Sequence, residues 1–165
     1  MVSDDFVGSA ETRALQNSKA ARESNYAWML KWGAYNLLKV KARAEVTPKV
    51  SGYITLLTHI SGMTPRDMEL ALGLRTGQLA GGADIYRLNN LPSEDGFNVR
   101  GYTTLVDGLR LKSDRKSDAF GYRPGQGAWQ VELTTAVDAT RIATLGPHDP
   151  FEPGLHPRVR AMYGH

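Results

Sequence analysis

The chain has no cysteine among its 165 residues, which excludes disulfides, thiolate zinc sites and a cysteine nucleophile. It has no apolar run near the ~20 residues of a membrane-spanning helix, so we expect a soluble protein without a membrane partner. The acidic opening of residues 1–5 is unlike a secretory signal. Because neither a Gly-x-Gly-x-x-Gly motif nor a P-loop occurs, nothing supports a Rossmann fold or a nucleoside triphosphatase.

Metal ligands and strongly charged blocks are also scarce. His148 and His156 lie in the C-terminal tail with no second pair of ligands nearby in sequence, so we expect no metal. The 20 basic and 17 acidic residues are mixed along the chain, and their net charge of +3 is only a weak argument for nucleic acid binding. A length of 165 residues and an apolar fraction of 41% predict a single domain with an ordinary core.

The N-terminal part has a helical composition. Residues 11–44 contain no proline and one glycine, Gly33, and are rich in Ala, Leu, Lys, Arg and Glu. This predicts one long helix or two short ones, and we assign residues 1–46 to an N-terminal helical extension. Aromatic residues broaden its apolar face, which favours packing against the rest of the domain over a binding surface; they are Trp28, Trp32 and Tyr35.

Two Thr-Pro pairs predict helix starts, at Thr47-Pro48 and Thr64-Pro65. After the first, apolar residues keep a three/four spacing to residue 60, although abundant Tyr, Ile and Thr leave a strand open. After the second, Asp67 completes an approximate capping box and Gly77 is the expected end of the helix.

Beyond residue 82 the sequence predicts sheet, with strands at 84–88, 98–105, 129–135 and 141–145. Residues 112–118 are expected to be a solvated loop and residues 121–127 a flap over a cleft. The predicted fold is α+β, with N-terminal helices followed by a mainly antiparallel β-core, and residues 47–165 form the main domain.

Three segments in this half carry residues suited to chemistry. In a strand at 129–133, Gln130 and Glu132 point to the same face because side chains alternate with a period of two. Arg87 ends an earlier predicted strand, and Thr103 and Thr104 lie between them. Each also has a plain structural interpretation: a salt bridge for the arginine, strand propensity for the threonines and the polar face of an edge strand for Gln130 and Glu132.

The order Tyr86-Arg87, Tyr102-Thr103-Thr104, Gln130-Val131-Glu132 resembles the arginine, serine/threonine, glutamate pattern of mono-ADP-ribosyltransferase toxins. Residues 72–79 are similar to the helix and loop that precede the arginine strand in that family. Residues 137–142 resemble the turn and isoleucine that follow the glutamate in its pierisin-like branch. The middle motif departs from the usual serine-threonine-serine, since Leu105 follows the threonines.

The resemblance implies transfer of ADP-ribose from NAD to a macromolecular acceptor, either protein or nucleic acid, on a domain of the ADP-ribosyltransferase fold. NAD would be the substrate and no metal would be needed. Glu132 would stabilise the positive charge that develops on the ribose, as carboxylates do in glycosidases. The implied catalytic residues are Glu132, Gln130 and Arg87, of which Gln130 would orient the acceptor. The implied NAD-binding residues are Arg87, Thr103, Thr104, Tyr102 and Trp129. Arg87 would hold the phosphates, and Trp129, Tyr102 or Tyr122 would stack on nicotinamide or adenine.

As a toxin, the domain would be delivered into a target cell without a signal peptide and would have an immunity protein as partner. Other functions stay open. Residues 124–130 are similar to a glycine-rich segment of the tuberculosis necrotizing toxin family, which favours an NAD glycohydrolase as the second hypothesis. A ribonuclease toxin is weaker because His59 lies on a predicted helix. A non-enzymatic virion or assembly component would use the aromatic helix to bind neighbours.

Overall fold

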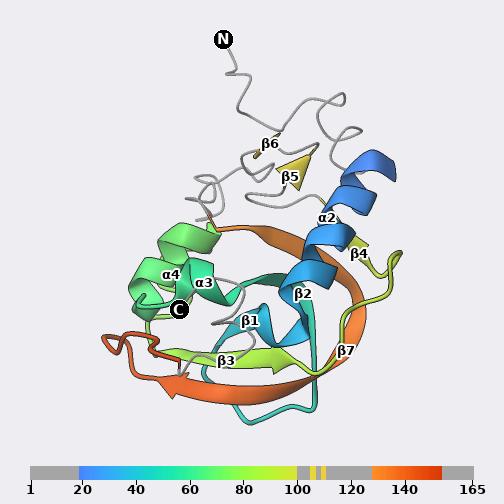
Figure 1. Cartoon of the computed structure of the whole chain (residues 1–165). Coiled ribbons are helices and arrows are strands. Elements are labelled where there is room, and N and C mark those ends of the chain that lie inside the picture. The colour runs from blue at the N-terminus through green and yellow to red at the C-terminus, as the bar shows by residue number, and fades with distance from the viewer. Residues whose placement is uncertain (1–18, 100–104, 107–108, 111–127, 154–165) are drawn as a thin grey trace.

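A computed structural model describes residues 19–99, 105–106, 109–110 and 128–153 of the chain (Figure 1). None of its helices, within those residues, has the length and apolar character needed to cross a membrane. The elements are α2 (Lys19–Trp32), the 3₁₀ turn η1 (Ala34–Asn36), β1 (Leu37–Ala42), β2 (Lys49–Leu56), α3 (Leu57–Ile60), α4 (Pro65–Leu72), β3 (Ala83–Leu88), β4 (Phe97–Asn98), β5 (Leu105–Val106), β6 (Leu109–Arg110) and β7 (Gln130–Leu145).

Four strands close into a small antiparallel barrel in the order β2-β1-β3-β7, because β7 also pairs with β2. The first half of β7 pairs with β2, from Gln130 to Asp138, and the second half pairs with β3, from Ala139 to Leu145. The short strand β4 pairs with the first half of β7, and β5 and β6 form a separate two-stranded antiparallel sheet. The predicted α+β class with an antiparallel core is therefore confirmed.

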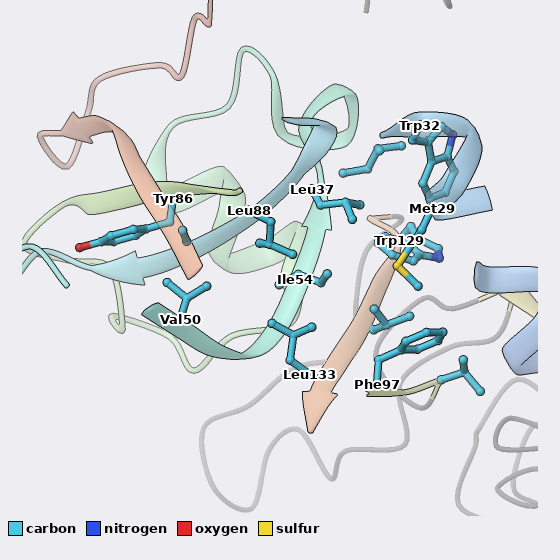
Figure 2. Close-up of a cluster of buried hydrophobic side chains, with 14 residues drawn as sticks. Met29, Trp32, Leu37, Val50, Ile54, Tyr86, Leu88, Phe97, Trp129 and Leu133 are labelled. Atoms are coloured by element: carbon cyan, nitrogen blue, oxygen red, sulfur yellow. The ribbon is translucent and has the colours of Figure 1, made fainter. Parts of the chain in front are cut away.

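Apolar side chains form two cores, one on each face of the barrel wall. The inner core fills the barrel and continues under α2, where Met29 and Trp32 pack with Trp129 (Figure 2). The outer core lies between the barrel and helices α3 and α4, and Leu38, Ile85 and Met68 belong to it. In Figure 1, α3 and α4 lie together on one side of the barrel, apart from α2. The two cores follow from strand alternation, with Leu37 facing inward and Leu38 outward.

Two of the predicted helices are wrong in part. Residues 37–42, assigned to the helical extension, form β1, which pairs with β2 and β3. Residues 49–56, predicted mainly as a helix, form β2, which is the strand alternative left open by their Tyr, Ile and Thr content. Both segments are strands because each forms part of the barrel wall and buries residues on both of its faces there.

The prediction for α4 is confirmed at its start and wrong at its end. The Thr64 hydroxyl accepts from the Asp67 backbone N–H, and the Asp67 carboxylate accepts from the Thr64 N–H, which completes the capping box. The helix ends at Gly73, before the expected Gly77. Gly73 has a φ of 64°, the left-handed conformation that closes a helix and suits glycine.

The strand predicted at 84–88 is confirmed as β3. The strands predicted at 129–135 and 141–145 are one continuous strand, β7, so the turn that the resemblance implied within 137–142 is absent from this described segment. A register shift opposite Ile85 and Tyr86 leaves Ile142 as an extra residue in β7, and such a bulge bends a strand without ending it. Of the strand predicted at 98–105, only the ends lie within described residues, in β4 and β5.

Candidate functional site

Glu132 lies on the outer face of β7, between two neighbouring strands. Its partner in β2 is Tyr53 and its partner in β4 is Asn98, whose side-chain amide donates to Glu132 Oε1 at 3.5 Å. The carboxylate is half-buried. A phenol and an amide therefore flank a partly exposed carboxylate, which can accept a hydrogen bond from a sugar hydroxyl.

Gln130 faces outward like Glu132, as predicted, but its environment is different. Its side chain is 2% exposed, and its amide Nε2 donates to the carbonyl of Leu72 at 3.1 Å. Leu72 is the last residue of α4, so this bond satisfies one of the carbonyls that a helix leaves unpaired at its C-terminus. The glutamine thus holds α4 on the barrel.

Arg87 also faces outward, from β3, and lines a cavity of about 440 Å³. The cavity lies between the barrel and the segment that follows β7. That segment is held by two backbone bonds of Phe151, whose N–H donates to the Met63 carbonyl and whose carbonyl accepts from Gly62 N–H. The other described polar side chains lining the cavity are Tyr35 and Glu152.

Arg87 and Gln130 are ends of one row of residues across the barrel wall. Gln130 pairs with Thr55, Thr55 with Leu38, and Leu38 with Arg87. Three strand spacings of about 4.8 Å place the outer two roughly 14 Å apart along the wall. Leu38 is fully buried in the outer core with α3 and α4. The helices therefore cover the middle of the row, and Arg87 lines a different cavity from the one that Gln130 lines.

Trp129 was predicted to stack on NAD, but its indole is 1% exposed and belongs to the inner core. The ring packs edge-on against Trp32, with centroids 5.0 Å apart, and its Nε1 donates to Asn25 Oδ1 at 2.8 Å. No face of the indole is left for a cofactor in the described structure, because α2 covers it. The other predicted binding residues lie outside the described residues: Tyr102, Thr103, Thr104 and the stacking candidate Tyr122.

Sequence reasoning missed a groove between β1 and β2. Within the described residues, these strands pair at Leu37–Leu56 and Leu38–Thr55 and then diverge. Two hollows of about 220 and 360 Å³ follow the gap, and they share the lining residues Lys39, Val40 and Gln78. We name these two adjoining hollows together the lysine groove; their polar lining includes Lys39, Lys41, Lys49, Ser51, Tyr53 and Gln78. Alternation of Lys39 and Lys41 with Leu38 and Val40 was the sequence signal for it.

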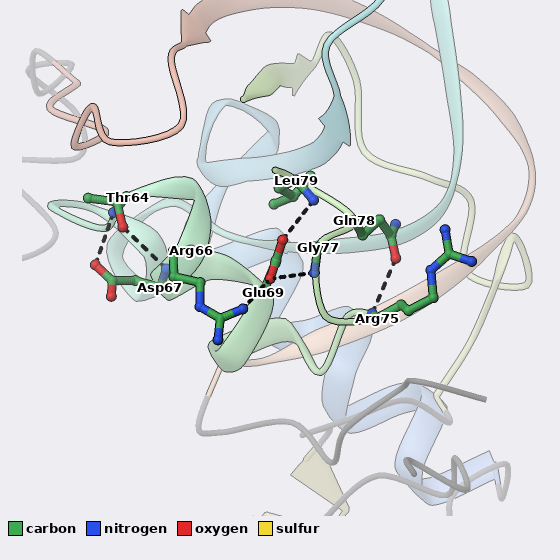
Figure 3. Close-up of polar contacts among 8 residues, drawn as sticks. All are labelled: Thr64, Arg66, Asp67, Glu69, Arg75, Gly77, Gln78 and Leu79. Atoms are coloured by element: carbon green, nitrogen blue, oxygen red, sulfur yellow. Dashed lines mark hydrogen bonds and ion pairs between the residues drawn. The ribbon is translucent and has the colours of Figure 1, made fainter. Parts of the chain in front are cut away.

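A buried carboxylate, Glu69, holds the loop that carries Gln78 to the lysine groove, and Figure 3 shows its contacts with that loop. Its Oε1 accepts from Gly77 N–H at 3.1 Å and from Arg66 at 2.9 Å, and its Oε2 accepts from Leu79 N–H at 2.8 Å. These bonds fold the loop after α4 back onto the helix. The loop carries Gln78 into the groove, so Glu69 positions a groove residue without lining the groove itself.

Replacing Glu69 with alanine is expected to lower the free energy of unfolding by about 3 kcal/mol, because two loop N–H donors lose a charged acceptor. Urea denaturation followed by tryptophan fluorescence measures the change. Glu69→Gln keeps one acceptor oxygen and should lose less. Arg66→Ala should change stability by under about 1 kcal/mol, because the Arg66 side chain is 57% exposed. Equal losses in Glu69→Ala and Arg66→Ala would contradict this account of the loop.

His59 has a structural contact: the Trp129 backbone N–H donates to its Nδ1 at 2.9 Å. An accepting Nδ1 means an unprotonated nitrogen at that position. Among the described residues, no group of three or more His, Asp or Glu side chains is arranged to hold a metal ion.

The candidate site consists of Glu132 with its strand partners Tyr53 and Asn98, and it lies next to the lysine groove.

Comparisons with protein-family models, with curated proteins and with solved structures each found no match to this chain.

Proposed function

We propose that the chain is a mono-ADP-ribosyltransferase of the toxin type, with the ADP-ribosyltransferase fold, and that Glu132 is its catalytic carboxylate. The observation that carries the proposal is the position of Glu132, partly exposed on the barrel wall beside a groove lined by lysines. Its strand partner Tyr53 is also a groove residue. A substrate that carries both phosphates and a reacting sugar needs this combination of groups, and NAD is such a substrate.

In the proposed reaction, the bond between ribose C1′ and the nicotinamide nitrogen breaks, and nicotinamide leaves with the electron pair. Positive charge develops on the ribose, and the Glu132 carboxylate stabilises it while holding a ribose hydroxyl. The acceptor then forms a bond to C1′ and releases one proton. Asn98, which donates to the carboxylate from the neighbouring strand β4, limits its movement.

One observation favours the second candidate, an NAD glycohydrolase, in which water is the acceptor. Gln130 was assigned the role of orienting a macromolecular acceptor, yet it is buried and its amide is bonded to Leu72. An acceptor-orienting group must be open to solvent before the acceptor binds. With water as acceptor, Gln130 needs no such exposure.

The test is incubation of the whole chain with adenine-labelled NAD, with and without cell lysate, followed by mass spectrometry. We expect nicotinamide release, with label transferred to protein or nucleic acid in the lysate. Release that yields free ADP-ribose alone would replace the transferase with the glycohydrolase. Absence of release from folded protein under both conditions would overturn NAD as the substrate.

A further inference from the structure

The lysine groove joins positive charge to hydroxyl and amide groups in two adjoining hollows. Of the described residues that line it, every charged one is a lysine, and the uncharged polar ones include Ser51, Tyr53 and Gln78. We propose that this groove binds the diphosphate group of a nucleotide. The assignment of this diphosphate to NAD rests on the proposed function. The binding of a diphosphate rests on the residues that line the groove.

The positions of the lysines suit an anion that bridges both walls of the gap. Lys39 and Lys41 come from β1, and Lys49 comes from the start of β2. The Lys39 ammonium lies 3.1 Å from the place where a Cβ would stand on Gly52, so glycine at this position leaves room for it. Gly52 also has a φ of 77°, which other residues rarely adopt. Lys39, Lys41 and Lys49 bring three positive charges to the groove, and the Lys41 ammonium lies 5.3 Å from the centroid of the Tyr86 ring. Ammonium groups form charge-assisted hydrogen bonds with phosphate oxygens.

The groove is placed correctly for a dinucleotide whose reacting ribose reaches Glu132. Tyr53 lines the groove and is the strand partner of Glu132, and such partners have Cβ atoms about 5 Å apart. In NAD a single methylene joins the diphosphate to the nicotinamide ribose. The Lys39 ammonium lies beside Gly52, the residue before Tyr53, so a diphosphate held by Lys39 lies at the end of the groove nearest the carboxylate. Arg87, which the sequence suggested for this task, faces the separate 440 Å³ cavity.

A carboxylate next to the groove, that of Asp138, allows the charge of the groove to be changed without replacing a lysine. Asp138 accepts from Lys49 at 2.9 Å, and both side chains are more than half exposed, at 60% and 57%. The ion pair partly neutralises Lys49. Removing the Asp138 charge should strengthen diphosphate binding, and loss of one exposed ion pair has little effect on stability.

The test measures binding of ADP-ribose, inorganic pyrophosphate and adenosine to the whole chain by isothermal titration calorimetry. We expect Lys49→Gln and Lys41→Gln each to weaken ADP-ribose binding about tenfold, because each removes a charge-assisted hydrogen bond. Asp138→Asn should strengthen it about threefold. Lys31→Gln on α2 is the charge-matched control and should match the wild type. Wild-type binding of ADP-ribose should weaken as salt increases.

The outcomes separate this inference from the proposed function. Pyrophosphate binding that depends on the groove lysines supports the inference even where NAD is not consumed, in which case the proposed function alone fails. Unchanged ADP-ribose affinity in both lysine variants, or a loss confined to Arg87→Gln, overturns the inference. So does an absence of ADP-ribose and pyrophosphate binding in the folded wild type. Asp138→Asn gives a gain of binding, which misfolding cannot produce.

Discussion

Glu132→Gln is expected to reduce the rate of nicotinamide release from NAD by about 10²- to 10³-fold, with the free energy of unfolding changed by under about 0.5 kcal/mol. The substitution keeps the volume of the side chain and an oxygen that accepts from Asn98 Nδ2. It removes the negative charge that stabilises the developing positive charge on the ribose. Steady-state release of nicotinamide, together with a thermal melt of each protein, measures both effects.

The matched control is Glu94→Gln, which removes the same charge from an exposed position in the loop before β4. This variant should release nicotinamide at the wild-type rate. If wild-type protein is active and Glu132→Gln is equally active, the catalytic carboxylate lies elsewhere in the chain. A reduced rate accompanied by a lowered melting temperature would instead identify Glu132 as a residue of the fold.

Trp129→Ala is expected to destabilise the protein by about 3–5 kcal/mol, a large fraction of the roughly 5–15 kcal/mol that stabilises a typical native protein. The indole joins the barrel to α2, through its edge contact with Trp32 and its bond to Asn25. Alanine leaves a cavity at this junction and removes the N–H donor from the buried Asn25. Urea unfolding followed by circular dichroism measures the loss.

Trp129→Phe separates these two contributions, since it keeps an aromatic ring and removes the indole N–H. We expect it to cost about 1–3 kcal/mol, mainly from the donor lost to Asn25. If Trp129 instead stacked on NAD, Trp129→Phe would weaken NAD binding while leaving stability unchanged. That result would contradict the packing of the indole in the inner core.

Patterns within a few residues of sequence correctly predicted the elements whose start or conformation depends on neighbouring residues in the chain. The Thr64–Asp67 capping box predicted the start of α4, and a β-branched and aromatic run predicted β3. The strand at Gln130 and the shared face of Gln130 and Glu132 also follow from local alternation. Residues 37–42 have the same alternating pattern, yet their Leu, Lys and Ala content favours a helix when the barrel partners are unknown.

The candidate site was harder to predict because it depends on which strands are neighbours. Order in the sequence suggested that Arg87 and Glu132 share one cleft, but the outer core with α3 and α4 lies over the row between Arg87 and Gln130. The lysine groove depends on where β1 and β2 diverge, which no single segment encodes. Burial of Gln130 likewise depends on the end of α4, at Leu72.

The long strand β7 has a consequence for biosynthesis. It is the last of the barrel strands to leave the ribosome, and it pairs with both β2 and β3. Until residues 130–145 emerge, β2 and β3 each keep an unpaired edge, which can join to other nascent chains. Closure also brings together residues far apart in sequence, which makes folding slow. The chain therefore acquires its native state only after the translation of β7, and until then its open strand edges are a route to aggregation.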